Sequence, residues 1–158
     1  MTGRQVIVRR ARAEDIPGLV ASSAGLFAED GGTRDSSVNV DWPREHGARS
    51  FAAALDDPAR LVLAVEHDGQ VVGHLMGSLT GPTAKRPVTS ATLVSIHVRP
   101  GHRRARAGDR LVEEFLDWAR RQGAEHAEVT AYSANTDAVR FYERSGFAAM
   151  TVTLRQPL

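Results

Sequence analysis

Positive charge is concentrated in one short stretch of the chain, SIHVRPGHRRARAGDRLVEEF, which spans residues 95–115. Its five arginines are Arg99, Arg103, Arg104, Arg106 and Arg110. A β-branched run precedes them and a helical repeat follows, so they stand where a strand passes into a helix. The first turn of a helix carries unpaired N–H groups and the positive end of the helix dipole, and arginine pairs well with phosphate. The stretch therefore predicts an anion site, with solvated arginines on an exposed turn as the alternative.

A second group of side chains that could do chemistry lies in AYSANTDAVRFYERSGF, residues 131–147. Asn135 is of a type preferred at the start of a helix, and Gly146 of a type preferred just past its end. Tyr142 lies at helical spacing from Ala138 and Gly146, as a buried core tyrosine would. A tyrosine can also donate a proton where a reaction needs an acid. The residues alone leave both interpretations of Tyr142 open.

Carboxylates gather earlier in the chain, in FAEDGGTRDSSVNVDWPREHG, residues 27–47. The stretch contains Glu29, Asp30, Asp35, Asp41 and Trp42. Carboxylates beside an aromatic ring attract a cationic group such as a protonated amine. The stretch also includes the longest irregular segment, and long loops in compact domains are often functional. The alternative is that each charge is simply solvated.

Hydrophobic periodicity divides the chain into alternating strands and helices. Strands are expected at residues 4–11, 60–66, 71–79, 90–98, 126–132 and 147–156, and helices at 13–30, 44–55, 104–122 and 135–145. Asp68-Gly69 marks a tight hairpin between the second and third strands. The order β-α-α-β-β-β-α-β-α-β predicts an α/β or α+β domain of three layers. Within it, residues 91–132 form a βαβ unit, so its two strands should be parallel with a right-handed crossover.

Composition narrows the function classes. The 158 residues are 42% apolar and 25% charged, as expected for a single globular domain over residues 1–158. No apolar run approaches the ~20 residues of a membrane span, and the N-terminal residues do not have the pattern of a secretory signal. A net charge of +1 argues against nucleic-acid binding, and a chain with no cysteine fits a cytoplasmic protein. The histidine spacing indicates no metal site.

Two motifs in these stretches resemble those of the GNAT superfamily of N-acetyltransferases. The first runs from Leu93 to Leu111, where the strand end Ile96-His97-Val98-Arg99-Pro100 leads into the loop Arg103-Arg104-Ala105-Arg106-Ala107-Gly108, similar to Q/R-x-x-G-x-G/A. The second is N-x-x-A-x-x-x-Y-x-x-x-G-F, matched by Asn135, Ala138, Tyr142, Gly146 and Phe147. Arg106 departs from the first motif, because it stands where the family has its first glycine.

The resemblance implies a GNAT-like α/β fold, with a mixed central sheet of about six to seven strands and helices on both faces. It also implies that acetyl-CoA is the cosubstrate and lies between splayed strands at 91–98 and 126–132. The cofactor-binding residues that it implies are Ile96, His97, Val98, Arg103, Arg104, Ala105, Arg106, Ala107, Gly108, Asp109, Asn135 and Tyr142. Arg106 fits this loop if its φ is helical and its side chain points away or onto a phosphate.

The implied reaction is transfer of an acetyl group to an amine by direct attack. The Val98 amide would stabilise the oxyanion and Tyr142 would protonate the departing CoA thiolate. Many family members carry a glutamate before the cofactor loop, but that position falls near Thr92 here, so the base must come from elsewhere. His97 is the preferred candidate because imidazole titrates near neutrality; His74 and Glu66 are the other two, and a structural role is the alternative for all three.

The first two helices of this fold usually shape the acceptor pocket, so the resemblance assigns Glu29, Asp30 and Trp42 to substrate binding. The leading expectation is a small-molecule amine, with a protein N-terminus or a lysine side chain as the alternative acceptor. The alternative from another functional class is a non-catalytic acyl-CoA-binding domain, which Arg106 and the missing glutamate support. A nucleic-acid-binding module would use the arginines but leave residues 135–147 unexplained. We expect no nucleic acid, membrane or metal as a partner, and we keep a homodimer as an open assembly.

Overall fold

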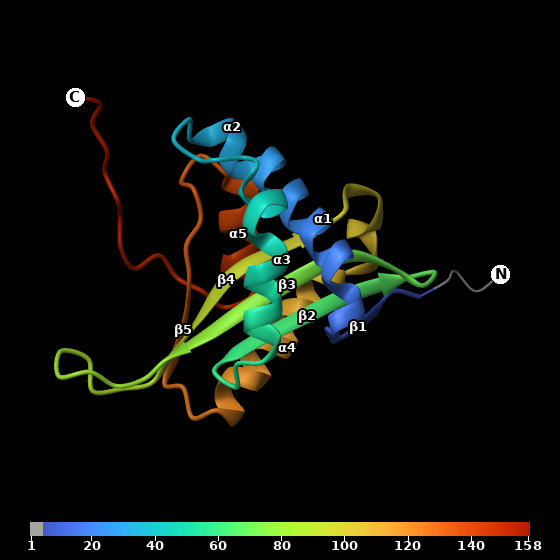
Figure 1. The fold of residues 1–158 in the computed structure, drawn as a ribbon. Coiled ribbons are helices and arrows are strands. Elements are labelled where there is room, and N and C mark those ends of the chain that lie inside the picture. The colour runs from blue at the N-terminus through green and yellow to red at the C-terminus, as the bar shows by residue number, and fades with distance from the viewer. Residues whose placement is uncertain (1–4) are drawn as a thin grey trace.

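A five-stranded mixed sheet forms the centre of the fold (Figure 1). The computed structural model describes residues 5–158, apart from the side chain of Arg104. The strands are β1 (Ile7–Arg10), β2 (Arg60–His67), β3 (Gln70–Thr80), β4 (Ser90–Val98) and β5 (His126–Val129), in that spatial order. β1 to β4 pair antiparallel and β4 pairs with β5 in parallel. The predicted class and the predicted parallel pair are therefore confirmed.

Helices cover both faces of the sheet. They are α1 (Ile16–Leu26), α2 (Gly32–Arg34), α3 (Trp42–Leu55), α4 (Ala107–Arg121) and α5 (Thr136–Arg144). Three further helical segments are the 3-10 turns Ala13–Asp15 and Pro100–Ala105 and the π-helix Phe27–Gly31. Figure 1 shows α1 and α3 in front of the sheet and α4 behind it. The three predicted layers are present.

Two apolar clusters hold the layers together, one on each face of the sheet. On the α4 face, Leu111, Phe115 and Trp118 recur at helical spacing and are buried against the strands. On the other face, Leu19 of α1 and Phe51 of α3 are buried against the β2–β3 hairpin. The hairpin turns at Asp68 and Gly69, which have φ of 53° and 75° as the Asp-Gly pair predicts. β4 is thus held between two packed layers.

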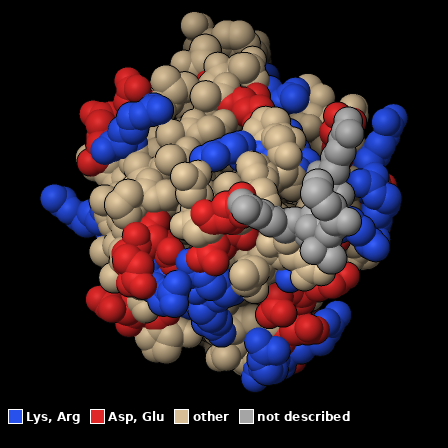
Figure 2. All heavy atoms as spheres, turned by 90° about the vertical axis from the view of Figure 1, so that its right-hand side faces the viewer, with Lys and Arg blue, Asp and Glu red and all other residues tan. Residues whose placement is uncertain are grey.

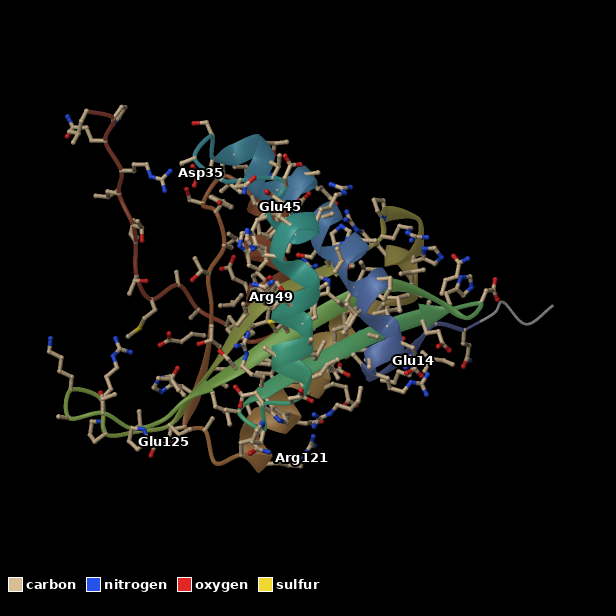
Figure 3. All side chains as sticks on the ribbon, in the orientation of Figure 1. Glu14, Asp35, Glu45, Arg49, Arg121 and Glu125 are labelled. Atoms are coloured by element: carbon tan, nitrogen blue, oxygen red, sulfur yellow. The ribbon has the colours of Figure 1, made fainter. Side chains whose placement is uncertain are left out.

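The sheet has fewer strands than expected, because the predicted last strand does not form. Residues 147–156 are not in a strand, and the side chains of Met150, Val152 and Leu154 are 91%, 83% and 90% exposed. Figure 3 shows this segment running apart from the sheet toward the loop labelled at Asp35, where the Arg155 Nη1 donates to the Asp35 Oδ1 over 2.8 Å. Alternating apolar residues satisfy one requirement of a strand, but the segment lies beside no sheet edge that could bond its backbone. The prediction of six to seven strands was wrong for the described residues.

Candidate active site

β4 changes partners along its length, and this opens one of its edges. Residues 90–93 pair with residues 126–129 of β5, and no pairing with β5 is present from Val94 to Val98. Val94 is the extra residue of a bulge against β3 and is half exposed. The second half of β4 therefore has a free backbone edge on the β5 side.

Val98 directs its backbone groups to this free edge. The Arg99 N–H donates to the Val72 carbonyl of the β3 side over 2.8 Å. Because residues along an antiparallel strand alternate in direction, Val98 turns its N–H and C=O the opposite way, and Ile96 does likewise. The Val98 carbonyl accepts a hydrogen bond from the Arg103 Nε over 2.8 Å. The Val98 amide therefore points to the free edge, and its role as an oxyanion donor stays a prediction.

The loop after β4 delivers the chain directly to the start of α4. It is the 3-10 turn Pro100–Ala105, followed by Arg106 with φ 57° and ψ 26°. This is the left-handed conformation that glycine adopts at no steric cost, so the expectation of a helical φ for Arg106 was wrong. Its side chain is 80% exposed and reaches the Asp109 carboxylate over 3.2 Å. The Arg106 side chain makes no capping hydrogen bond to α4, so among the described residues the first N–H groups of the helix have no N-cap side chain as an acceptor.

The remaining predicted loop residues differ in what they offer. Ala107 is fully buried in the core. Gly108 lies beside the ring of Phe141, where an added Cβ would make an ordinary contact at 3.4 Å. Ala105 is exposed, and both alanines offer only backbone groups. Arg110 instead turns to β1, where it donates to the Val6 carbonyl over 2.8 Å. The predicted role of the Arg104 side chain lies outside the described residues.

Two neighbouring acidic residues, Glu29 and Asp30, form hydrogen bonds with different parts of the site. Both lie in the π-helix at the end of α1, a rare element that often occurs at functional sites. The Glu29 Oε2 accepts from the Arg103 Nη2 over 2.7 Å and lies 3.0 Å from the His97 Nε2. The Asp30 Oδ1 accepts from the Asn135 Nδ2 over 3.0 Å. The acidic segment therefore joins β4 and its loop to the start of α5.

The three predicted substrate residues already have partners within the chain, and their role in substrate binding stays a prediction. Glu29 and Asp30 are paired with predicted cofactor-side residues, and the Arg103 hydrogen bond holds the pKa of Glu29 below its usual value, although burial opposes the shift. Trp42 stacks on Phe27 with ring centres 5.9 Å apart and near-parallel planes. Its ring thus lies against the first residue of the π-helix that carries both acids.

α5 positions the two polar residues of the second motif. The Asn135 Oδ1 accepts from the Ala138 N–H over 3.1 Å, so Asn135 caps the helix while its Nδ2 holds Asp30. Tyr142 is half-buried between Phe141 and Phe147. Burial, and then the negative charge of Asp30, raise the pKa of Tyr142 to about 12. Its phenol is therefore protonated at neutral pH and can donate.

The three base candidates have different surroundings. Glu66 is paired with Arg9 over 2.9 Å in a structural network with Asp15. His74 is fully buried, and burial lowers its pKa to about 3. Burial also lowers the pKa of His97, while the hydrogen bond to Glu29 raises it. His97 lines a cavity of about 300 Å³, which lies between α1 and the β3–β4 end of the sheet, whereas Glu66 lines a separate cavity of about 420 Å³ beside Arg9 and Asp15.

Sequence reasoning missed two serines that contact these histidines. The Ser22 Oγ lies 2.7 Å from the His74 Nδ1 and 3.4 Å from the His97 Nδ1. The Ser95 Oγ lies 3.0 Å from the His74 Nε2. The pair Ser22-Ser23 inside the otherwise apolar run LVASSAGLF was the available signal, because hydroxyls buried in a helix need a partner.

Two further observations concern partners. No helix among the described residues has the length and apolarity needed to cross a membrane. The same part of the chain contains no group of three or more side chains arranged to hold a metal ion.

Comparison with known proteins first defines the class of the fold. The solved structure of the aminoglycoside N-acetyltransferase AAC(6')-Iy in complex with CoA is similar with a TM-score of 0.76, over 99% of this chain and 96% of that one. Its sequence identity is 14%, so the likeness concerns the fold alone. This chain and that protein therefore share one arrangement of sheet and helices.

Sequence comparison then gives the family. Residues 29–147 match the acetyltransferase (GNAT) family. Streptothricin acetyltransferase of Streptomyces lavendulae is 32% identical over 123 residues, which are 78% of this chain and 56% of that protein. An uncharacterized N-acetyltransferase of Mycobacterium tuberculosis is 30% identical over 97 residues, 61% of this chain and 58% of that protein. The chain therefore belongs to the GNAT family of acetyltransferases, and it spans less than two thirds of the length of these curated relatives.

Proposed function

We propose that this chain transfers an acetyl group from acetyl-CoA to the primary amine of a small molecule by direct attack. The observation that carries the proposal is that two sets of free backbone groups follow each other directly along the chain. The free edge of β4, from Val94 to Val98, leads through one short turn into the uncapped start of α4. An extended ligand that ends in a diphosphate would find hydrogen-bond partners for its extended part along the free edge of β4. Its diphosphate would find free N–H groups at the start of α4.

Each residue of the site then has a defined task. The first N–H groups of α4 bind the diphosphate, and the free-edge amides of Ile96 and Val98 bond the pantetheine arm and the thioester oxygen. Acetyl-CoA supplies an activated acyl group with a thiolate as its leaving group. Tyr142, protonated at neutral pH, donates a proton to the sulfur. His97, whose lowered pKa keeps it neutral at pH 7, accepts the proton that the amine loses.

A small amine is the acceptor that the relatives favour. The names of the streptothricin and aminoglycoside acetyltransferases refer to small amine-bearing molecules. The acids of the π-helix lie beside the free edge of β4, where a cationic amine would be attracted. We expect a protein N-terminus or a lysine side chain to be a poorer acceptor.

The test is a thiol-release assay with acetyl-CoA and a panel of amines. The panel contains streptothricin, an aminoglycoside, a polyamine, an amino-acid ester and a lysine peptide. We expect turnover with at least one small amine, and Tyr142→Phe should lower kcat roughly 100-fold because an acid at the leaving group contributes that much. Tyr132→Phe, which removes the other phenol of the chain, is the matched control and should keep wild-type kcat.

Three outcomes would contradict the proposal. Thermal stabilisation by CoA without turnover on any amine favours a non-catalytic acyl-CoA-binding domain. Turnover on the lysine peptide alone makes the chain a protein acetyltransferase. Salt-sensitive retention of DNA without CoA binding would favour the nucleic-acid reading, although Figure 2 shows acidic and basic side chains interspersed on the face that it presents. The homodimer stays a prediction, which light scattering can test.

A further inference from the structure

Five polar side chains form one continuous chain of hydrogen-bonding contacts beneath α1. It begins at Ser95 on β4, crosses the sheet to His74 on β3, rises to Ser22 on α1, returns to His97 on β4 and ends at Glu29. The successive contacts are Ser95 Oγ to His74 Nε2 at 3.0 Å, His74 Nδ1 to Ser22 Oγ at 2.7 Å, Ser22 Oγ to His97 Nδ1 at 3.4 Å and His97 Nε2 to Glu29 Oε2 at 3.0 Å. We call these five residues the internal chain.

The chemistry of its last member fixes every proton in the internal chain. An ionised Glu29 can only accept, so the His97 Nε2 carries the hydrogen, and neutral His97 then accepts at Nδ1. The Ser22 hydroxyl therefore donates to His97 and accepts from the His74 Nδ1. His74 is neutral, so its Nε2 accepts from the Ser95 hydroxyl. All hydrogens point from Ser95 toward Glu29, which is the arrangement needed to pass a proton in that direction.

Packing alone does not require these groups. His74 and Ser22 lie within the apolar layer formed by Leu19, Phe51 and their neighbours, with the Phe51 ring edge-on to His74 at 5.7 Å. Burying polar side chains is costly unless each finds a partner, and an apolar set would avoid that cost. Gly25 makes room for the arrangement, because a Cβ there would lie 2.9 Å from the His97 Cε1. The chain therefore has hydrogen-bonding side chains at positions where apolar side chains could pack.

The two ends of the internal chain open at different places. Ser95 is half-buried and follows the bulge at Val94, in the part of β4 that has left β5. At the other end, Ser22, His97 and Glu29 line the cavity of about 300 Å³, which is large enough for water. The internal chain therefore connects the free edge of β4 to solvent on the α1 side.

We propose that the internal chain is a proton relay, in which Ser22 and His74 are positioning residues that carry the amine proton to His97 and back. This rests on the proposed acetyl transfer. As the amine attacks, its N–H bond breaks and the proton moves to the Ser95 oxygen. Ser95 then gives its own hydrogen to the His74 Nε2, and His74 gives its Nδ1 hydrogen to Ser22. Finally, Ser22 gives its hydrogen to the His97 Nδ1.

The proton rests on His97 as an imidazolium beside the Glu29 carboxylate. When the thiolate leaves, the same movements in reverse return one proton to the site, either to sulfur or to the phenolate of Tyr142. One N–H bond is lost and one S–H bond is gained, and the relay recovers its starting arrangement. His74 never holds a net charge, so its low pKa does not prevent it from taking part.

The charges that face the relay suit a temporary store of positive charge. Glu29 favours imidazolium at His97, whereas Arg103, Arg99 and burial oppose it. A positive charge on His97 opposes one on His74, which lies on the other side of Ser22, because it lowers the pKa of His74 further. Because these influences oppose one another, His97 can accept a proton without retaining it.

The first test reads the tautomers directly and needs no turnover. Nitrogen-15 NMR of the imidazoles in the whole chain at pH 7 should show His74 with its hydrogen on Nδ1 and His97 with its hydrogen on Nε2. His74 carrying hydrogen on Nε2 would overturn the relay, because Ser95 could not then donate to it. This reading stands even if no amine is acetylated, so it separates failure of the relay from failure of the proposed function.

The second test interrupts the relay at Ser22. Ser22→Ala should lower kcat at least tenfold, leave the KM for acetyl-CoA unchanged and remove the dependence of kcat on the ionisation of His97. Ser22→Thr restores a hydroxyl and should recover most of kcat, whereas Ser23→Ala removes a buried hydroxyl beside it, outside the internal chain, and should have no effect.

The double variant distinguishes a relay from a structural effect. If the two residues act in one path, adding His97→Gln to Ser22→Ala should lower kcat no further, whereas independent structural effects would multiply. Wild-type kcat and an unchanged pH profile in folded Ser22→Ala would overturn the relay.

Discussion

The starts of α4 and α5 are opposites, although both helices follow a strand of the parallel pair. α5 has a side-chain cap, because Asn135 accepts from the Ala138 N–H. α4 has none and is preceded instead by Arg106 in a left-handed conformation. The first turn of a helix favours negative charge wherever its N–H groups are free. The proposed diphosphate site is therefore the start of α4, whereas at the start of α5 the Asn135 side chain already occupies the Ala138 N–H.

The same contrast extends to the two acids of the π-helix. Glu29 binds to the α4 side through Arg103, and Asp30 binds to the α5 side through Asn135. One acid thus sits beside the candidate base, His97, and the other influences the candidate acid, Tyr142. Adjacent residues in the sequence serve opposite halves of the proposed reaction.

The largest difference between the two helix starts is expected in CoA affinity, when a carboxylate is added to one start or the other. Gly108→Asp places a negative charge in the first turn of α4 and should weaken CoA binding roughly 100-fold, or about 2.7 kcal/mol, because it repels the diphosphate and competes for the same N–H groups. Thr136→Asp adds the same charge to the first turn of α5 and should leave CoA binding unchanged. Calorimetric titration with CoA measures both, and equal losses would show that α4 has no special role.

Removing each acid of the π-helix should move a different limb of the pH profile. Glu29→Gln removes the group that raises the pKa of His97, so the acidic limb of kcat/KM should move to lower pH. Asp30→Asn removes a charge that raises the pKa of Tyr142, so the basic limb should move to lower pH. His97→Ala should abolish the acidic limb, and an unchanged profile in that variant would exclude His97 as the base.

Loss of the side chain at each helix start should affect stability unequally. Asn135→Ala removes the cap and the contact with Asp30 and should cost about 1 kcal/mol of the free energy of unfolding. Arg106→Ala removes only an exposed ion pair with Asp109 and should change stability by less than about 0.5 kcal/mol. Urea denaturation compares the two, and a larger loss at Arg106 would reveal a structural task for its side chain.

The smallest effect is expected from restoring the family's glycine. Arg106→Gly removes a Cβ from a left-handed conformation and should stabilise the chain by at most about 1 kcal/mol, since glycine also gains freedom in the unfolded state. Because the Arg106 side chain is 80% exposed and turned to Asp109, affinity for CoA should change by less than about threefold, which is under 1 kcal/mol. A large gain in affinity would mean that Arg106 obstructs the site.

Sequence predicted those elements whose cause is local. The Asp68-Gly69 turn, the apolar face of α4 and the Asn135 cap follow from residues close together in the chain. The predicted strand at 147–156 failed because pairing needs a neighbouring edge, which periodicity does not encode. The union of Glu29 with His97 joins residues 68 positions apart, and the contact of Ser22 with His74 joins residues 52 apart, so only the packing of α1 on the sheet reveals them.

The motifs indicated which segments form the candidate site, but they did not indicate how its side chains pair. Asn135 holds Asp30, and Arg103 holds both Glu29 and the Val98 carbonyl. The roles of these residues in binding and catalysis stay predictions. Arg106, which stands where the motif has a glycine, has a left-handed φ of 57°. A motif describes a backbone path, and side-chain pairing within it depends on tertiary contacts.

The most direct test of the contrast between the two helix starts is to follow backbone amide resonances during titration with CoA. The account predicts the largest shifts at residues 105–109, smaller ones along Ile96 to Val98, and little change at the capped amides around Ala138. Shifts concentrated at the start of α5, or no saturable change at α4, would contradict it.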